Sequence, residues 1–321
     1  MRIILCLAAV VVIFGQVVSG QSPARKIKVT LVKNAYSGSR EEAEISPGPE
    51  ALLAGGVADV LNRLGCETTA TQEARLTPEE DKQYGAWNRM GMANGHLGKI
   101  VADTLRVGSF PVALLANCNS LMGMLAGLQH SGGGRPLKVG LVWIDAHADF
   151  NTPETTLSGM LGGMPVAVST GLCLSRFRIQ SGLDPSLPFS YVVMVAVRDI
   201  DPLEQELVDR CRIEIVPAGE LRAPFARLDA QMKRLGELTD LIYVHIDMDV
   251  LDPGEVSGHP LTVPGGPSSS QLAAALEAIF KYKKAAALGI ASYPSQRDRD
   301  KISLKAAYRL IEGSIRGFQA R

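Results

Sequence analysis

The sequence predicts an α/β fold built on a parallel sheet. Two observations indicate it: short apolar runs rich in β-branched residues recur along the chain, and longer helical patterns lie between them. Strands that are buried on both faces read as continuous apolar runs, and their alternation with helices is typical of βαβ units. We therefore expect one domain from residue 25 to residue 321 (25–321), and 46% hydrophobic residues suffice for a large core.

The expected elements follow one another in chain order. Strands are predicted at 26–32, 111–116, 138–145, 191–197, 213–218, 241–250 and 285–292. Helices are predicted at 49–65, 95–105, 119–129, 224–238 and 268–282. In open α/β sheets, ligands bind beyond the carboxyl ends of the strands, so polar side chains at those ends are the first candidates for a functional site.

The first twenty residues have the layout of a secretory signal. Arg2 precedes an apolar run from Ile3 to Phe14, and the small residues Ser19 and Gly20 follow. The run is short for a membrane span, so a signal peptide at 1–20 is favoured over a retained anchor. We expect an exported protein, periplasmic or secreted, with no membrane segment after removal of the signal.

The charge balance gives no reason to expect nucleic acid as a partner. The formal net charge is +0, because 33 basic residues are matched by 33 acidic ones. A protein that pairs with phosphates needs a basic stripe, and the sequence has none. A small-molecule ligand is the expectation that remains.

Two stretches place metal-ligand side chains two residues apart, just after apolar strands. The first has Asp145, His147 and Asp149, and the second has Asp247 and Asp249. In an extended chain, side chains two apart share a face, so each stretch directs its groups to one side. Asp is also common in caps and turns, but two stepped motifs at strand ends favour a ligand site. Converging carboxylates repel without a cation, and carboxylates with an imidazole suit Mn²⁺, Fe²⁺ or Zn²⁺.

The segments DAHADFNTPETTLSG (145–159) and HIDMDVLDP (245–253) resemble the second and third metal motifs of the arginase/agmatinase, or ureohydrolase, family. The resemblance covers nearly all of the mature chain, including VRDIDP (197–202) and HPLTVPGG (259–266). It implies a three-layer α/β/α fold with a central, mostly parallel sheet. It also implies a two-manganese centre that activates a bridging hydroxide against a guanidinium carbon. A homo-trimer or homo-hexamer is a further implication.

The resemblance implies a set of metal ligands. One metal ion would be bound by four residues that are all present, namely Asp145, His147, Asp247 and Asp249. The second ion would share Asp145 and Asp247, take Asp149 as a further ligand, and require a histidine. In this set Asp149 is also the candidate catalytic residue.

The histidine of the second site is missing. The family's first metal motif, G-G-D-H-S, matches ANCNS (116–120), so Asn119 stands in the place of the ligand histidine. We therefore expect one sound Mn²⁺ site and a second site weakened by Asn119, with other divalent metals as alternatives. His245 could compensate, or it could be hydrogen-bonded in the wall of the site. His259 precedes a loop proline and is interpreted as a surface or hydrogen-bonded histidine.

Two further positions depart from the family pattern. Gly162 in SGMLGG (158–163) replaces a histidine that resembles a proton shuttle to the leaving amine. When IASYPSQRD (290–298) is aligned on its proline, Ala291 replaces the glutamate that would hold the guanidinium. Loss of a general acid typically lowers a rate by roughly 10²–10⁴-fold, and a methyl group cannot pair with a guanidinium.

The amino-acid end of the pocket retains its pattern. In arginases the loop after the second motif grips the substrate carboxylate, and Asn151, Thr156 and Ser158 match those positions. Asp201 matches the carboxylate that faces the α-amino group. The resemblance thus implies a small amino-acid-like substrate whose guanidinium end is recognised differently.

Three functions remain open from the sequence. The first is a metal-dependent hydrolase that cleaves a linear amidine or guanidino C–N bond of an amino-acid-like substrate, with altered or weak activity. The second is a catalytically impaired relative that binds a metal and an amino-acid ligand. The third is an inactive subunit of a mixed oligomer. Gly162 and Ala291 favour the second, whereas the intact ligand motifs favour the first, because packed carboxylates are costly to keep without a metal. We favour the first.

Overall fold

The computed structural model of the chain describes residues 26–38 and 47–321. The predicted signal peptide at 1–20 lies outside the described residues, so this segment and the export that it implies stay predictions. Within the described ranges, no helix combines the length and the apolar character needed to cross a membrane.

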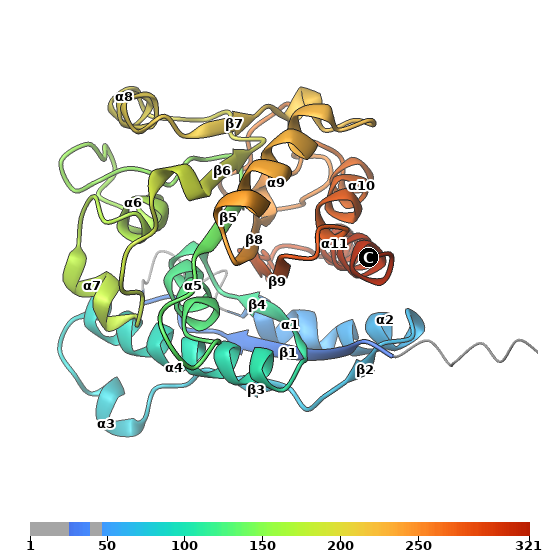
Figure 1. Cartoon of the computed structure of the whole chain (residues 1–321), viewed down its shortest axis with the longest axis horizontal. Coiled ribbons are helices and arrows are strands. Elements are labelled where there is room, and N and C mark those ends of the chain that lie inside the picture. The colour runs from blue at the N-terminus through green and yellow to red at the C-terminus, as the bar shows by residue number, and fades with distance from the viewer. Residues whose placement is uncertain (1–25, 39–46) are drawn as a thin grey trace, which may run out of the picture.

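Within the described part of the chain, nine parallel strands form the central sheet (Figure 1). Their order across the sheet is β2-β1-β4-β9-β8-β5-β6-β7, and β3 also pairs with β1. The strands are β1 (Lys28–Asn34), β2 (Glu67–Thr68), β3 (Gln72–Glu73), β4 (Phe110–Leu115), β5 (Val139–Ile144), β6 (Val192–Val195), β7 (Glu214–Val216), β8 (Leu241–Asp247) and β9 (Ala285–Ala291). All seven strands predicted from the sequence are confirmed. The additional strands, β2 and β3, have two residues each, too short to give an apolar run.

Helices cover both faces of the sheet, which confirms the three-layer α/β/α arrangement (Figure 1). One face packs on α1 (Gly48–Ala54), α2 (Val57–Arg63), α9 (Ala226–Leu238), α10 (Ser269–Phe280) and α11 (Ile302–Gln319). The other packs on α4 (Ala86–Arg106), α5 (Leu121–Gln129), α6 (Pro165–Ser169), α7 (Ser175–Gln180) and α8 (Pro202–Cys211), and the short α3 (Pro78–Asp81) precedes α4. Strand β4 contributes side chains to both hydrophobic cores. Val112 and Leu114 pack in the core on the α10–α11 side, and Ala113 and Leu115 pack in the core on the α4–α5 side.

The helix predicted at 49–65 is two helices. It breaks between α1 and α2 at Gly55 and Gly56, and the backbone of Gly56 has a φ of 99°. This left-handed conformation is open to glycine but costs energy for other residues, so the glycine pair turns the chain where the apolar pattern alone reads as continuous.

The sheet register brings the carboxyl ends of β5 and β8 together. Ile144 of β5 pairs with Ile246 of β8, so the residues that follow, Asp145 and Asp247, begin side by side. On the other side of β8, Asp247 pairs with Ala291 of β9. The end of β4 lies one strand further along, because β4 pairs with β9.

Candidate metal centre

Three buried carboxylates form the base of the site. Asp145, Asp247 and Asp249 are 1%, 5% and 2% exposed. The backbone N–H of Asp249 donates to Oδ1 of Asp247 at 2.9 Å, and the N–H of His147 donates to Oδ1 of Asp145 at 2.7 Å. The carboxylates of Asp145 and Asp247 are thus each oriented by the turn that follows, whereas Oδ1 of Asp249 accepts from the N–H of Ala146 at 3.4 Å.

His147 completes the base. Its Nδ1 lies 3.4 Å from Oδ1 of Asp145 and 3.2 Å from Oδ2 of Asp249. Burial lowers the pKa of His147, but the hydrogen bonds to the two carboxylates outweigh burial and raise the pKa to about 12. We call Asp145, His147, Asp247 and Asp249 the carboxylate floor.

The backbone conformation that brings these side chains together differs from the extended conformation predicted from the sequence. Strand β5 ends at Ile144, so residues 145–149 form a loop and not an extended continuation of the strand. Asp149 has a φ of 47°, in the left-handed region, and its carboxylate is absent from the described groups of close metal-ligand atoms. Asp149 is buried near the floor, and its role as a metal ligand and catalytic residue stays a prediction.

Negative charge is concentrated here. Burial is the largest cause that raises the pKa of Asp145, Asp149, Asp247 and Asp249, and the next cause for each is the charge of a neighbouring carboxylate. A bound cation reverses this effect, because it favours the ionised carboxylates that coordinate it.

The sequence interpretation missed Cys118. It begins the 3₁₀ turn Cys118–Ser120 after β4, and its Sγ lies 3.0 Å from Oδ2 of Asp247 and 3.9 Å from Oδ2 of Asp145. Asn119, the next residue, is 1% exposed, and its side-chain amide has no hydrogen-bond partner among the described residues. The signal was present in ANCNS, since a cysteine beside a metal-motif position is itself a ligand-type residue.

His259 also lies beside the floor. It is 8% exposed, and its Nε2 has no hydrogen-bond partner in the described part of the chain. That nitrogen lies 3.8 Å from Oδ1 of Asp247. His259 is therefore not a surface residue, but it is hydrogen-bonded as expected, because its Nδ1 accepts from the N–H of Leu261 at 3.2 Å. The loop 251–267 brings it back to the floor, and sequence spacing does not show such a return.

His245 is hydrogen-bonded in the wall of the site. Its Nδ1 lies 2.9 Å from the hydroxyl of Tyr243, and its Nε2 lies 3.2 Å from Sγ of Cys118. The imidazole stacks on Trp143 with ring centroids 4.4 Å apart. Burial lowers the pKa of His245 to about 3, so the ring is neutral.

The predicted substrate residues form an outer rim, by which we mean Asn151, Thr156, Ser158 and Asp201. Nδ2 of Asn151 donates to Oδ2 of Asp201 at 3.1 Å, so these two side chains meet. Asp201 is also the N-cap of α8, where it forms a capping box with Glu204. Thr156 and Ser158 lie 3.5 Å apart through their hydroxyl oxygens in an exposed turn. Their role in substrate binding stays a prediction.

The described residues fit a metal ion. Three groups each offer three ligand atoms within 4.8 Å of one another: Asp145 with His147 and Asp249; Cys118 with Asp145 and Asp247; and Asp247 with Asp249 and His259. Nε2 of His259 is buried without a partner among the described residues, whereas Nδ1 of the same ring accepts from the N–H of Leu261 at 3.2 Å. The fold and this floor define the class: an α/β protein with a carboxylate–imidazole metal centre at the ends of parallel strands.

Comparison with known proteins identifies the family. Residues 38–315 match the Arginase family. An arginase from Brevibacillus brevis is 29% identical over 230 residues, which are 69% of this chain and 75% of that protein. An N(omega)-hydroxy-L-arginine amidinohydrolase from Streptomyces lavendulae is 40% identical over 139 residues, 43% of this chain and 46% of that protein. The crystal structure of an arginase from Bacillus cereus shares the fold, with a TM-score of 0.79 at 22% identity over 90% of this chain and 98% of that chain.

The chain belongs to the arginase family. It is thereby a member of a family of metal-dependent hydrolases that act on C–N bonds in linear amidines and use two manganese ions. The resemblance inferred from the two stepped motifs is confirmed.

Proposed function

We propose that this protein hydrolyses the amidino C–N bond of an amino-acid-like substrate and that its activity on L-arginine is weak or altered. The observation that carries the proposal is the convergence of Asp145, His147 and Asp249, whose ligand atoms lie within 4.8 Å of one another. Asp247 lies beside them at the end of β8. This is the full ligand set that the family resemblance implies for one metal ion, with Mn²⁺ as the proposed ion.

The residues divide the work of such a reaction. A bound divalent cation lowers the pKa of a coordinated water and so supplies a nucleophile near neutral pH. The carboxylate floor would hold such a cation. Asn151 and Asp201, already hydrogen-bonded to each other, are proposed to orient the carboxylate and amine of the substrate.

Two positions support the altered activity. Gly162, in the 3₁₀ turn Leu161–Gly163, has no side chain that could protonate a leaving amine. Ala291 ends β9 directly beside Asp247 and offers only a methyl group to a guanidinium. Because a positioned general acid typically contributes 10²–10⁴-fold, we expect slow turnover of L-arginine.

The experiment that tests this proposal measures amine release by metal-loaded protein. L-arginine and Nω-hydroxy-L-arginine both yield ornithine, and agmatine, which lacks the carboxylate, serves as the matched control. We expect at least roughly tenfold higher kcat/KM for an amino-acid substrate than for agmatine, equivalent to about 1.4 kcal/mol. Rapid hydrolysis of L-arginine would contradict the altered activity, and no hydrolysis of any of the three would contradict the hydrolase.

Ala291 and Gly162 together favour a second candidate function. A protein that keeps the metal and the outer rim but cannot hold a guanidinium would bind an amino acid without cleaving it. Calorimetric binding of L-arginine or L-ornithine to metal-loaded protein, with no product after prolonged incubation, would identify this function.

We also propose that the protein is a homo-trimer or homo-hexamer and that it is exported. The oligomer is supported by family membership, and light scattering of the purified protein tests it. Export is supported by the apolar run from Ile3 to Phe14, and the N-terminal sequence of protein recovered outside the cytoplasm tests it. A monomer, or an intact N-terminus on protein confined to the cytoplasm, would contradict the respective proposal.

A further inference from the structure

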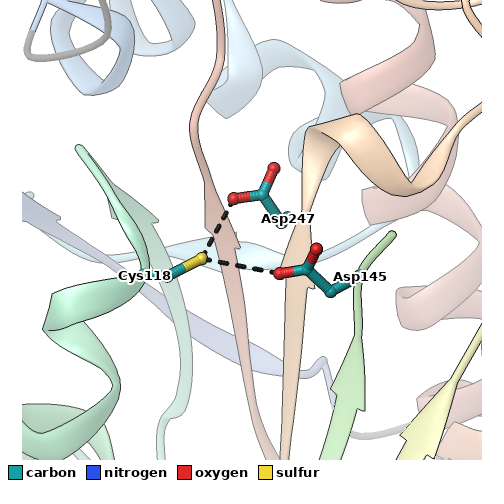
Figure 2. A group of neighbouring side chains, drawn as sticks. All are labelled: Cys118, Asp145 and Asp247. Carbon is teal, nitrogen blue, oxygen red and sulfur yellow. Dashed lines mark hydrogen bonds between the residues drawn. The ribbon is translucent and has the colours of Figure 1, made fainter. Parts of the chain in front are cut away.

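Cys118 places a sulfur atom among the carboxylates of the floor (Figure 2). It comes from the loop after β4, whereas Asp145 follows β5 and Asp247 ends β8. Its Sγ lies 3.0 Å from Oδ2 of Asp247 and 3.9 Å from Oδ2 of Asp145. Three segments that are distant in the sequence thus direct one potential ligand atom each towards a common point.

The separations suit atoms that share one ion. Ligand atoms around a tetrahedral Zn²⁺, at bond lengths of ~2.0–2.3 Å, lie roughly 3.5 Å from one another. The two sulfur–oxygen distances, 3.0 and 3.9 Å, fall on either side of that value.

A second observation points to a ligand at the same place. Nε2 of His259 is buried, has no hydrogen-bond partner within the described ranges, and lies 3.8 Å from Oδ1 of Asp247. An unpaired buried polar atom costs on the order of 1–3 kcal/mol unless something satisfies it. Asp247 therefore faces the thiol of Cys118 on one oxygen and the unpaired Nε2 of His259 on the other, while Nδ1 of that ring is paired with the N–H of Leu261.

Burial and the charges of Asp247, Asp145 and Asp149 raise the pKa of the Cys118 thiol, so the sulfur would become anionic on binding a cation. One neighbouring side chain is placed to support the anionic form. The hydroxyl of Tyr243 lies 2.9 Å from Nδ1 of His245, and when it donates there the ring carries its proton on Nε2. That N–H then points at Sγ of Cys118, 3.2 Å away. The arrangement is tightly held, because a Cβ at Gly289 would lie 2.0 Å from the Tyr243 hydroxyl. Donors of this kind fix a metal ligand and tune its charge.

We propose that Cys118 binds a metal ion as a thiolate, together with Asp145 and Asp247, and that this second site prefers a thiophilic divalent cation such as Zn²⁺ to Mn²⁺. The thiol proton leaves to solvent as the sulfur–metal bond forms. Thiolates select softer cations such as Zn²⁺, whereas carboxylate-rich sites suit Mn²⁺. The inference rests on the proposed metal-dependent function and replaces one expectation from the sequence, since Cys118 restores the site that Asn119 weakens.

Cobalt is the probe that tests this proposal. Protein stripped of metal is titrated with Co²⁺, because a thiolate–cobalt bond gives an intense near-ultraviolet charge-transfer absorption that oxygen and nitrogen ligands do not give. We expect this absorption in the wild type and in Cys211→Ser, the matched control at a half-buried cysteine on α8. We expect its loss in Cys118→Ser and in Cys118→Asp, the second of which keeps an oxygen ligand.

Elemental analysis after loading with Zn²⁺ provides the second measurement. The wild type should hold two ions per chain and Cys118→Ser one, with affinity at the second position lowered by roughly 100-fold or more, the upper end of what lost supporting contacts cost a metal site. Absence of the absorption in the wild type overturns the proposal without any variant, whereas its assignment to Cys118 requires one of the two Cys118 variants to fold, because the described chain has three other free cysteines.

The outcomes separate this proposal from the function on which it rests. One or two bound Co²⁺ ions without the sulfur absorption would overturn the role of Cys118 and leave the hydrolase proposal standing. Persistence of the absorption in folded Cys118→Ser would also overturn it. Failure to bind any ion would overturn both.

Discussion

The carboxylate floor and the outer rim hold their side chains by different means. Asp145 and Asp247 of the floor are buried, and they begin side by side because β5 and β8 are in register. Ser158 and Thr156 of the rim are held by local turn contacts, such as the N–H of Met160 donating to Oγ of Ser158 at 3.2 Å. The sheet thus determines where a cation can bind. The exposed loop of the rim is proposed to determine which substrate binds beside the cation, and its sequence can change without disturbing the sheet.

Removal of the carboxylate shared by most of the floor contacts should have the largest effect. Asp247→Ala should abolish metal binding, because Asp247 lies in two of the three groups of close ligand atoms. The fold should persist, since the change also removes charge repulsion from Asp249. Elemental analysis checks this, with Asp209→Ala on the exposed face of α8 as the control. Unchanged metal content in Asp247→Ala would mean that the floor is not the metal site.

A change in the rim should leave the metal bound and weaken the binding of the substrate. Asp201→Asn should raise KM for an amino-acid substrate by about 10–100-fold, since a hydrogen bond to a charged group contributes roughly 1.5–3 kcal/mol. Asn also caps helices well, so α8 should remain intact. The matched substrate is 4-guanidinobutyrate, which has no α-amino group and should be unaffected. An equal loss for both substrates would show that Asp201 acts on structure and not on the amine.

A change at the edge of the floor should shift metal preference. Asn119→His should raise Mn²⁺ affinity by about tenfold, or about 1.4 kcal/mol, because imidazole is a stronger ligand than an amide oxygen. With Cys118 present, the number of bound ions should not change. Competition with a metal-binding dye measures the affinity, and Asn119→Gln is the control. If Mn²⁺ binds the two variants equally, Asn119 does not reach the metal.

The smallest effect should come from the exposed part of the rim. Ser158→Ala should raise KM about threefold, because an exposed hydrogen bond contributes only about 0.5–1 kcal/mol. Metal content should stay constant, and the free energy of unfolding should change by less than about 0.5 kcal/mol. Substrate kinetics and thermal unfolding check both parts. A loss of bound metal in this variant would remove the distinction between the two regions.

The sequence was sufficient to predict the elements and site residues that follow a regular residue spacing. Apolar runs located seven strands, and the two-residue step located Asp145, His147, Asp247 and Asp249. The step succeeded even though the chain leaves the strand at Ile144, because the loop turns Asp145 and His147 back to each other. Asp149, two residues further, has a left-handed backbone, and there the assumption of an extended chain no longer holds.

Site residues that are placed by the conformation of a loop could not be predicted from residue spacing in the sequence. Cys118 and Asn119 are adjacent, and the 3₁₀ turn decides which of them faces the carboxylates. His259 lies ten residues beyond Asp249 and is brought back by a loop with no periodic pattern. The break at Gly56 is of the same kind, since one backbone angle divides a helix that the apolar pattern leaves whole.

The carboxylate of Asp247 is contacted by four separate segments of the chain. Its Oδ2 accepts from Ser292 after β9 and from Cys118 after β4, while its Oδ1 accepts from the N–H of Asp249 and lies near His259. The N–H of Asp249, in the turn that follows, orients the Asp247 carboxylate. A residue in any one of the other three segments can therefore be substituted while Asp247 keeps its orientation. A single substitution at Cys118 or His259 would therefore change the side chains around a cation while Asp247 keeps its orientation.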